Sequence, residues 1–260
     1  MTTRFKLSGT LAALLFMIMS FAQASGFAEK RELYQLKIYH LKDNSQRERL
    51  ETYLKQAYLP ALHRAGIGKI GVFKAGADAD SLIYVLIPFK SEKQFLSLSE
   101  KIAGDKGYLA AADDYLNTSF DNPVFKNFES ILMESIAGMP VLQVPALKSQ
   151  AADKIYELRR YEAASEKLHD NKISQFNNGE LDIFKRLNFN TVFCGKVLAG
   201  SKLPSLVYMT SFENKAERDA HWKAFSADPE WIKLNARAEY AHNFLRADIY
   251  LLHPVTYSEI

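Results

Sequence analysis

The stretch Tyr34-Gln-Leu-Lys-Ile-Tyr39 decides how this chain folds, because it returns later as Tyr156-Glu-Leu-Arg-Arg-Tyr161. A second motif, Leu82-Ile-Tyr84, returns as Leu206-Val-Tyr208. The two offsets are 122 and 124 residues. Since two separate motifs keep nearly one spacing, the chain is predicted to contain two copies of a domain of about 120 residues.

Each half is predicted to run strand, helix, strand, strand, helix, helix, strand. Alternating apolar residues indicate the strands, and apolar stripes at helical spacing indicate the helices. The strands are expected at 33–41, 70–74, 82–89 and 131–136, and again at 155–161, 191–198, 206–212 and 246–252. A helix from Ser165 to about Leu187 is expected to be interrupted at Asn177-Asn-Gly179. The βαββαβ order is typical of a ferredoxin-like α+β sandwich.

The N-terminal segment has the pattern of an export signal. Arg4 and Lys6 precede an apolar run over 11–22, and Ala22-Gln-Ala24 has the small residues of a cleavage site. The run is too short to span a bilayer, which takes roughly 20 residues. Residues 1–24 are therefore predicted to be a signal peptide, and the mature chain is predicted to be a soluble periplasmic or secreted protein without a membrane span.

The boundaries of the predicted domains follow from the repeats and from a proline-containing stretch between them. The first repeat is expected at 25–139 and the second at 154–260. The intervening residues 140–153 carry two prolines and then become polar, which indicates a linker.

The charge balance argues against a nucleic-acid-binding protein, and the cysteine content excludes a protein stabilised by intrachain disulfides. Two of the 33 basic residues lie in 1–24, which leaves 31 against 30 acidic residues and no basic footprint for nucleic acid. Cys194 is the only cysteine, so no intrachain disulfide can form. Because it lies in an apolar strand-like run, Cys194 is interpreted as a buried structural thiol. The six histidines show no spacing suited to a metal.

Four stretches of the second half together resemble the NIPSNAP family: Ile155-Tyr-Glu-Leu-Arg-Arg-Tyr161, Leu206-Val-Tyr-Met-Thr-Ser-Phe212, Ala216-Glu-Arg-Asp-Ala-His-Trp222 and Phe225-Ser-Ala-Asp-Pro-Glu-Trp231. The first half is similar only more loosely. The resemblance implies a dimeric α/β barrel, in which two ferredoxin-like units pack sheet to sheet. Here both units would lie in one chain, as an intrachain barrel.

The resemblance implies little about chemistry, because animal members of the family are associated with mitochondria, vesicle trafficking and protein contacts and have no agreed reaction. The wider barrel superfamily includes cofactor-free monooxygenases, haem-degrading enzymes and haem peroxidases. A fold shared by so many activities does not itself assign one. Function has to be argued from a site.

Strand alternation supplies a candidate site on the first strand of each half. Side chains two residues apart share a face of a sheet. One face therefore holds an acceptor, a cation and a phenol in each half, namely Gln35, Lys37 and Tyr39, and Glu157, Arg159 and Tyr161. If that face lines the barrel, these groups form a cleft for a small anionic or aromatic ligand, with Tyr84 and Tyr208 as walls. The alternative is a structural ion pair between Glu157 and Arg159.

Two further features have a structural and a functional interpretation. Asp228-Pro-Glu-Trp231 has the residues of an ordinary helix start. His221 is a candidate haem ligand or general base, although a capping or partly buried role also explains it.

The sequence favours a binding protein, without catalysis, for a small molecule or a protein partner, and a homodimer is possible. No cofactor is required by this hypothesis. The alternative is an oxidoreductase or monooxygenase that acts on an aromatic or lipophilic substrate, with haem as a conceivable cofactor.

Overall fold

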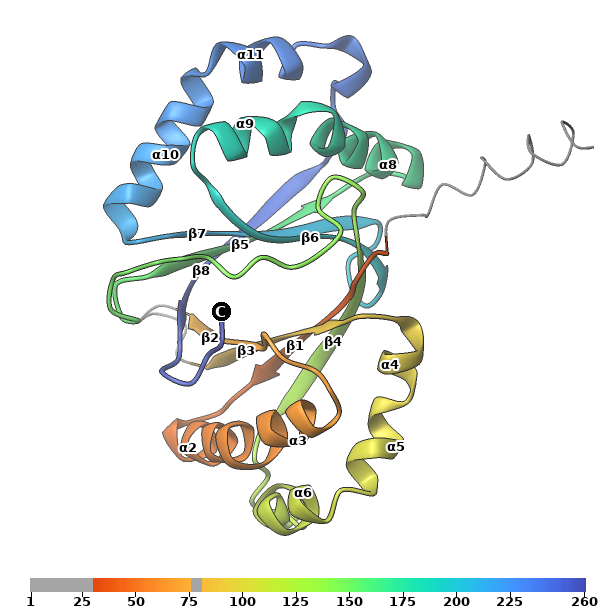
Figure 1. Cartoon of the computed structure of the whole chain (residues 1–260), viewed down its shortest axis with the longest axis vertical. Coiled ribbons are helices and arrows are strands. Elements are labelled where there is room, and N and C mark those ends of the chain that lie inside the picture. The colour runs from red at the N-terminus through yellow and green to blue at the C-terminus, as the bar shows by residue number, and fades with distance from the viewer. Residues whose placement is uncertain (1–29, 76–80) are drawn as a thin grey trace, which may run out of the picture. The chain divides into compact units, whose positions relative to one another are not determined.

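Eight antiparallel strands close into a barrel in the described part of the chain, which comprises residues 30–75 and 81–260 of a computed structural model (Figure 1). The strands of the first half are β1 (Leu33–His40), β2 (Gly71–Ala75), β3 (Leu82–Phe89) and β4 (Asn127–Ser135). Those of the second half are β5 (Ile155–Glu162), β6 (Asn190–Ala199), β7 (Ser205–Phe212) and β8 (Arg246–Pro254). The predicted mixed α/β fold is confirmed.

The two halves have the same strand order. The first is β4-β1-β3-β2 and the second is β8-β5-β7-β6, and the barrel closes where β2 pairs with β8 and β4 pairs with β6. In both halves the repeated motif therefore forms a central strand, with hydrogen-bonded neighbours on either side.

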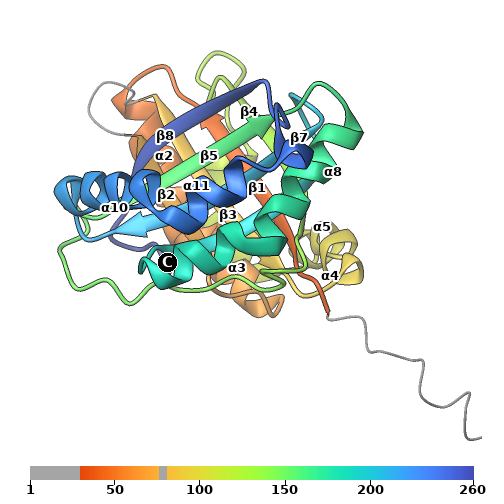
Figure 2. The same ribbon diagram turned by 90° about the horizontal axis from the view of Figure 1, so that it is seen from above.

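The helices cover the outer faces of the two halves of the barrel. The first half carries α2 (Asn44–Tyr53), a π-helical turn (Leu54–Tyr58), α3 (Leu59–Arg64), α4 (Glu92–Leu96), α5 (Leu98–Ala103), α6 (Lys106–Ala111) and α7 (Asp113–Leu116). The second carries α8 (Glu166–Gln175), a π-helical turn (Phe176–Glu180), α9 (Leu181–Arg186), α10 (Lys215–Ala227), α11 (Pro229–Asn235) and a 3₁₀ turn (Ala238–Tyr240). Within residues 31–260 the layers are thus helices, sheet, sheet, helices, and Figure 2 shows α8 to α11 lying over the second sheet.

Local sequence explains two of the helix features that were predicted. Asp228 caps α11, because its carboxylate accepts from the backbone N–H groups of Glu230 and Trp231. The long helix of the second half is interrupted at the π-helical turn, where Asn178 and Gly179 leave helical backbone geometry and Gly179 has a φ of 151°. Glycine tolerates this positive φ without steric cost, which explains its use there.

Buried apolar side chains of the described residues form three separate clusters. One cluster fills the barrel and receives side chains from all eight strands, among them Leu36, Met133, Leu158 and Met209. The other two lie between each half of the sheet and its own helices. Since the strands bury both faces, their side chains are sorted between the barrel interior and the helix-covered outside.

The segment 140–153 is packed against both halves. Leu142 is buried in the barrel cluster, and its backbone N–H donates to the carboxylate of Glu32. The backbone N–H of Gln143 donates to the carbonyl of Val192. The predicted linker is therefore part of the core packing, while the domain limits stay a prediction.

Within residues 30–75 and 81–260, the helices are all too short or too polar to cross a bilayer. The predicted signal peptide lies outside the described residues.

Candidate functional site

A large cavity lies on the helix-covered face of the first half. Its volume is about 690 Å³, and it is bounded by β1, by the π-helical turn after α2 and by α4 to α7. Apolar side chains form most of the wall, and its polar side chains are Gln35, Lys37, Ser99 and four tyrosines. This volume falls in the range of roughly 300–1,000 Å³ that is usual for small-molecule sites.

Lys37 is the cation of this cavity. Its Nζ donates to the hydroxyls of Tyr39 at 3.4 Å and Tyr58 at 3.5 Å, and it lies 4.9 Å from the ring centroids of Tyr58 and Phe128. No acidic side chain of the described residues forms an ion pair with it at 4.0 Å or less. Burial lowers the pKa of Lys37 to about 8, because the charged amine has left water without gaining a carboxylate. This amine therefore lacks the counter-ion that a purely structural lysine would need.

Four tyrosines give the cavity aromatic walls with polar edges. Tyr53 stacks on Tyr115 with 3.6 Å between the ring centroids, and on Tyr58 with 5.6 Å. The hydroxyls of Tyr53 and Tyr108 are 3.1 Å apart. Burial raises the pKa of Tyr53 and of Tyr58, so both phenols stay protonated and remain hydrogen-bond donors.

The rim of the cavity is apolar and open to solvent. Leu96 is 72% exposed, Leu109 45% and Leu116 44%, and all three line the cavity. Exposed leucines around a concave site indicate a mouth through which a lipophilic molecule can enter.

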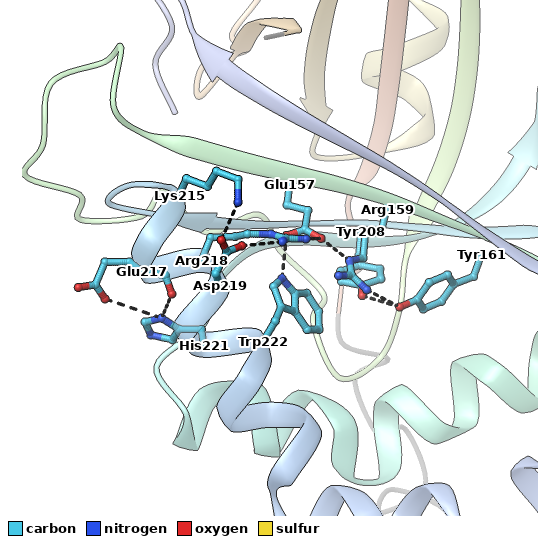
Figure 3. A network of polar contacts seen from close by, with 10 residues as sticks. All are labelled: Glu157, Arg159, Tyr161, Tyr208, Lys215, Glu217, Arg218, Asp219, His221 and Trp222. Atoms are coloured by element: carbon cyan, nitrogen blue, oxygen red, sulfur yellow. Dashed lines mark hydrogen bonds and ion pairs between the residues drawn. The ribbon is translucent and has the colours of Figure 1, made fainter.

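The same face of the second half is filled by a polar network centred on Glu157 (Figure 3). Glu157 is fully buried, and its carboxylate accepts from Arg159 Nε at 2.6 Å. It also accepts two hydrogen bonds from Arg218, at 2.7 and 2.9 Å, and one from Trp222 Nε1 at 2.7 Å. Burial alone would raise the pKa of Glu157, but Arg218 and Arg159 hold it below its ordinary value.

Arg159 is held on three sides. Its guanidinium carbon lies 3.6 Å from the ring centroid of Trp222, and its Nη1 donates to the hydroxyl of Tyr161 at 3.3 Å. The hydroxyls of Tyr161 and Tyr208 are 2.9 Å apart. These contacts favour the structural interpretation of the Glu157–Arg159 pair, because each charged group already has its partners.

The cleft hypothesis required this face to line the barrel, and the face lies outside it. Lys37, Tyr39, Arg159 and Tyr161 lie on the outer face under the helices, whereas the alternate side chains, such as Leu36 and Leu158, fill the barrel. The barrel interior takes the more apolar set, because most of it is enclosed between the two sheets and away from water.

Tyr84 does not join Lys37 and Tyr39, contrary to prediction. In the register of β1 and β3, Leu36 lies opposite Leu86, whereas in β5 and β7 Leu158 lies opposite Met209. Leu86 and Met209 are 123 residues apart, one fewer than the spacing of the Leu-x-Tyr motifs. A shift of one residue turns a side chain to the other face, so Tyr84 enters the barrel while Tyr208 lies under the helices.

His221 does not fit the role of a haem ligand. Its Nδ1 donates to the carbonyl of Glu217 one turn earlier on α10, and its ring packs 5.5 Å from those of Phe189 and Phe212. It does not line the cavity of Lys37. Among residues 30–75 and 81–260, no group of three or more His, Cys, Asp or Glu is placed to hold a metal ion. Cys194 is buried, and burial raises the pKa of its thiol.

The cavity tyrosines were missed by the sequence reasoning. Tyr53, Tyr58, Tyr108 and Tyr115 come from α2, the π-helical turn after it, α6 and α7, and the one available signal was their density in the helices of the first half.

Comparisons with known proteins agree with the barrel fold. Residues 156–259 match the family model described as NIPSNAP. The chain is similar to a putative monooxygenase from Lactobacillus acidophilus NCFM, with a TM-score of 0.56, 13% identity, and coverage of 86% of this chain and 94% of that one. It is also similar to a putative monooxygenase from Fusobacterium nucleatum subsp. nucleatum ATCC 25586, with a TM-score of 0.54, 9% identity, and coverage of 86% and 92%. No curated protein matches this sequence.

Proposed function

We propose a division of roles between the halves, because residues 156–259 match the NIPSNAP family model and the open cavity belongs to the other half of the chain. The first half binds a small aromatic or lipophilic molecule that carries one negative charge. The second half, whose equivalent face is filled by the Glu157 network, supports the barrel. The single observation that carries this proposal is the cavity of about 690 Å³ with the unpaired amine of Lys37 in its wall.

The walls of the cavity indicate the chemistry of each part of the ligand. The stacked rings of Tyr53 and Tyr115 and the leucine rim suit an aromatic or apolar body. The amine of Lys37 suits an anionic group, since a lysine donates up to three hydrogen bonds and accepts none. The tyrosine hydroxyls add donors for a second oxygen.

A fluorescent pair of probes tests this proposal. The sulfonated dye 8-anilinonaphthalene-1-sulfonate carries one negative charge, and N-phenyl-1-naphthylamine has a similar ring system without the charge. Lys37→Met should weaken binding of the anionic dye about tenfold or more, as expected for loss of a charge-assisted hydrogen bond, and should leave the neutral dye unaffected. Lys101→Met is the matched control, because Lys101 is an exposed lysine on α5 that does not line the cavity.

Equal binding of the anionic dye to wild type and Lys37→Met would refute the role of the amine. Native mass spectrometry of the purified chain is a complementary measurement. An extra mass that disappears on denaturation would identify the natural ligand, whereas a bare mass would favour a protein partner.

A second candidate function is oxidation of the same ligand. The observation that favours it is the pKa of Lys37, which burial lowers to about 8, so that a part of the amine is neutral near neutral pH. A neutral amine is a general base and can take a proton from a phenolic ligand. Dioxygen uptake in the presence of phenolic aromatics would support this function if Lys37→Met abolished it. Absence of uptake over a panel of such compounds would leave binding alone.

We also infer that the two halves descend from one duplicated ferredoxin-like unit, which is supported by their identical strand order. Export of the protein, a homodimer and haem binding stay predictions.

A further inference from the structure

A second, smaller cavity lies at one end of the barrel interior. Its volume is about 130 Å³, and it shares no lining residue with the cavity of Lys37. Its walls come from both sheets: Tyr84 on β3 faces Tyr250 on β8, with 6.2 Å between the ring centroids. Arg160 on β5 lines the same cavity.

Arg160 is a buried cation without a hydrogen-bond or ion-pair partner among the described residues. The residue is 7% exposed, yet its guanidinium has no acceptor within 3.5 Å and no carboxylate within 4.0 Å among residues 30–75 and 81–260. A guanidinium carries five N–H donors. The nitrogen atoms of Arg160 keep access to the space of the cavity, so their unused donors can hold an acceptor that enters it.

The carboxylates near this end of the barrel are already engaged by other groups. Glu129 contacts His40 at 2.9 Å and accepts from Ser201 at 3.2 Å. Asp248 accepts from Lys202 at 2.6 Å. These acids influence Arg160 through space but do not touch it, so they do not satisfy its hydrogen bonds.

Besides Arg160 and Lys202, whose amine donates to Asp248, the cavity offers two phenol donors. The hydroxyls of Tyr84 and Tyr250 have no hydrogen-bond partner in the described part of the chain, and Tyr84 is almost completely buried. A phenol hydroxyl next to a guanidinium is a common arrangement for holding an oxyanion, because both groups donate to it.

We propose that the barrel-end cavity binds the carboxylate group of a small monocarboxylic acid, held by Arg160 and the hydroxyls of Tyr84 and Tyr250. A cavity of 130 Å³ has room for about four water volumes of roughly 30 Å³ each, which suits a molecule of the size of acetate or propionate. The planar guanidinium matches a carboxylate with two parallel hydrogen bonds.

A singly charged ligand is favoured over a doubly charged phosphate by the same surroundings. Glu129 and Lys202 both line the cavity, and Asp248, which lies opposite Arg160 in the register of β5 and β8, pairs with Lys202 at 2.6 Å. The charges of Lys202 and Asp248 offset each other, which leaves the charge of Glu129 to repel a ligand in proportion to the ligand's own negative charge. Acetate should therefore bind more tightly than phosphate. A general basic patch would have the opposite preference.

The test compares sodium acetate, sodium phosphate and sodium chloride at equal ionic strength, with thermal unfolding and titration calorimetry as measurements. Acetate should raise the Tm of the wild type by several degrees in a saturable way, whereas chloride and phosphate should give a smaller shift. Arg160→Gln should abolish the acetate effect. Arg246→Gln is the matched control, because Arg246 is near the same barrel end but exposed and already paired with Glu162 at 2.6 Å.

Tyr84→Phe covers the case in which Arg160→Gln does not fold, since it removes one hydroxyl and keeps the ring. This variant should raise the Kd for acetate about tenfold, as expected for a lost hydrogen bond to a charged group. The proposal is overturned if acetate and chloride act equally on the wild type, if phosphate binds more tightly than acetate, or if Tyr84→Phe leaves the acetate affinity unchanged.

Discussion

Replacing Glu157 with glutamine tests whether the polar network of the second half is structural. The substitution keeps the size and shape of the side chain but removes its charge. Glu157 accepts four hydrogen bonds, from Arg159, Arg218 and Trp222, and is fully buried. After the substitution, the largely buried Arg159 loses its carboxylate partner, and the amide NH₂ of glutamine points a donor at other donors.

The expected loss of unfolding free energy follows from these contacts. Removing one partner of a buried ion pair costs about 3–5 kcal/mol. Because Arg218 retains some access to solvent and can pair with Asp219, we expect the lower end of that range, about 3 kcal/mol. For a domain of this size, that corresponds to a decrease in Tm of roughly 6–12 °C.

Urea denaturation of the wild type and Glu157→Gln at several pH values is the assay. The folded-state pKa of Glu157 lies below its ordinary value of about 4.3. The stability that it contributes is therefore present above that value and is lost as pH falls through the folded-state pKa. The wild type should lose stability with acid more steeply than the variant, and the two curves should converge at low pH.

The double variant Glu157→Gln/Arg159→Met supplies the control. Because it removes the buried cation together with its partner, it should recover part of the loss caused by the single change. If Glu157→Gln loses less than about 1 kcal/mol, which is the scale of an exposed ion pair, the network is not structural and our interpretation of the filled face is refuted.

Three further predictions concern other parts of the barrel. Affinity for an anionic dye in the first cavity should fall as pH rises through about 8, because Lys37 then loses its charge, and the Lys37→Met variant should show no such fall in fluorescence titrations. Lys172→Met should lower the free energy of unfolding by about 3–5 kcal/mol in urea denaturation. The substitution leaves the buried carboxylate of Glu180, which lies 2.9 Å from Lys172 Nζ in the wild type, without this cation. Lys172→Met/Glu180→Leu should recover most of that loss. Gly195→Ala should lower the free energy of unfolding by about 1–3 kcal/mol in the same assay, because the new methyl group would lie 2.9 Å from Cβ of Met133. An unchanged denaturation midpoint would show that the barrel core rearranges to accommodate the methyl group without loss of stability.

Strand positions were predictable from the sequence because they depend on local alternation. Both copies of the repeated motif form central strands, and the interruption at Asn177 to Gly179 appears where it was expected. The face of each strand was harder to predict. Polar residues such as Glu157 and Arg159 suggest a water-filled cleft, but helices that come later in the chain bring Arg218 and Trp222 to cover them.

The two cavities could not be predicted, because both depend on side chains from distant segments. Tyr53 and Tyr115 are 62 residues apart and meet only after α2 and α7 have packed on the sheet. The barrel-end cavity depends on register: had β3 been shifted by one residue against β1, Tyr84 would lie outside the barrel and the cavity would lose its hydroxyl.

The presence of both halves in one polypeptide has a consequence for the evolution of this barrel. A barrel made from two copies of one shorter chain is bound by its two-fold symmetry, so a substitution that opens one outer face opens the other as well. Here each sheet is encoded separately. A tryptophan can cover the outer face of one sheet while a lysine and tyrosines line a cavity on the outer face of the other. Substitutions can therefore accumulate on either face independently of the other.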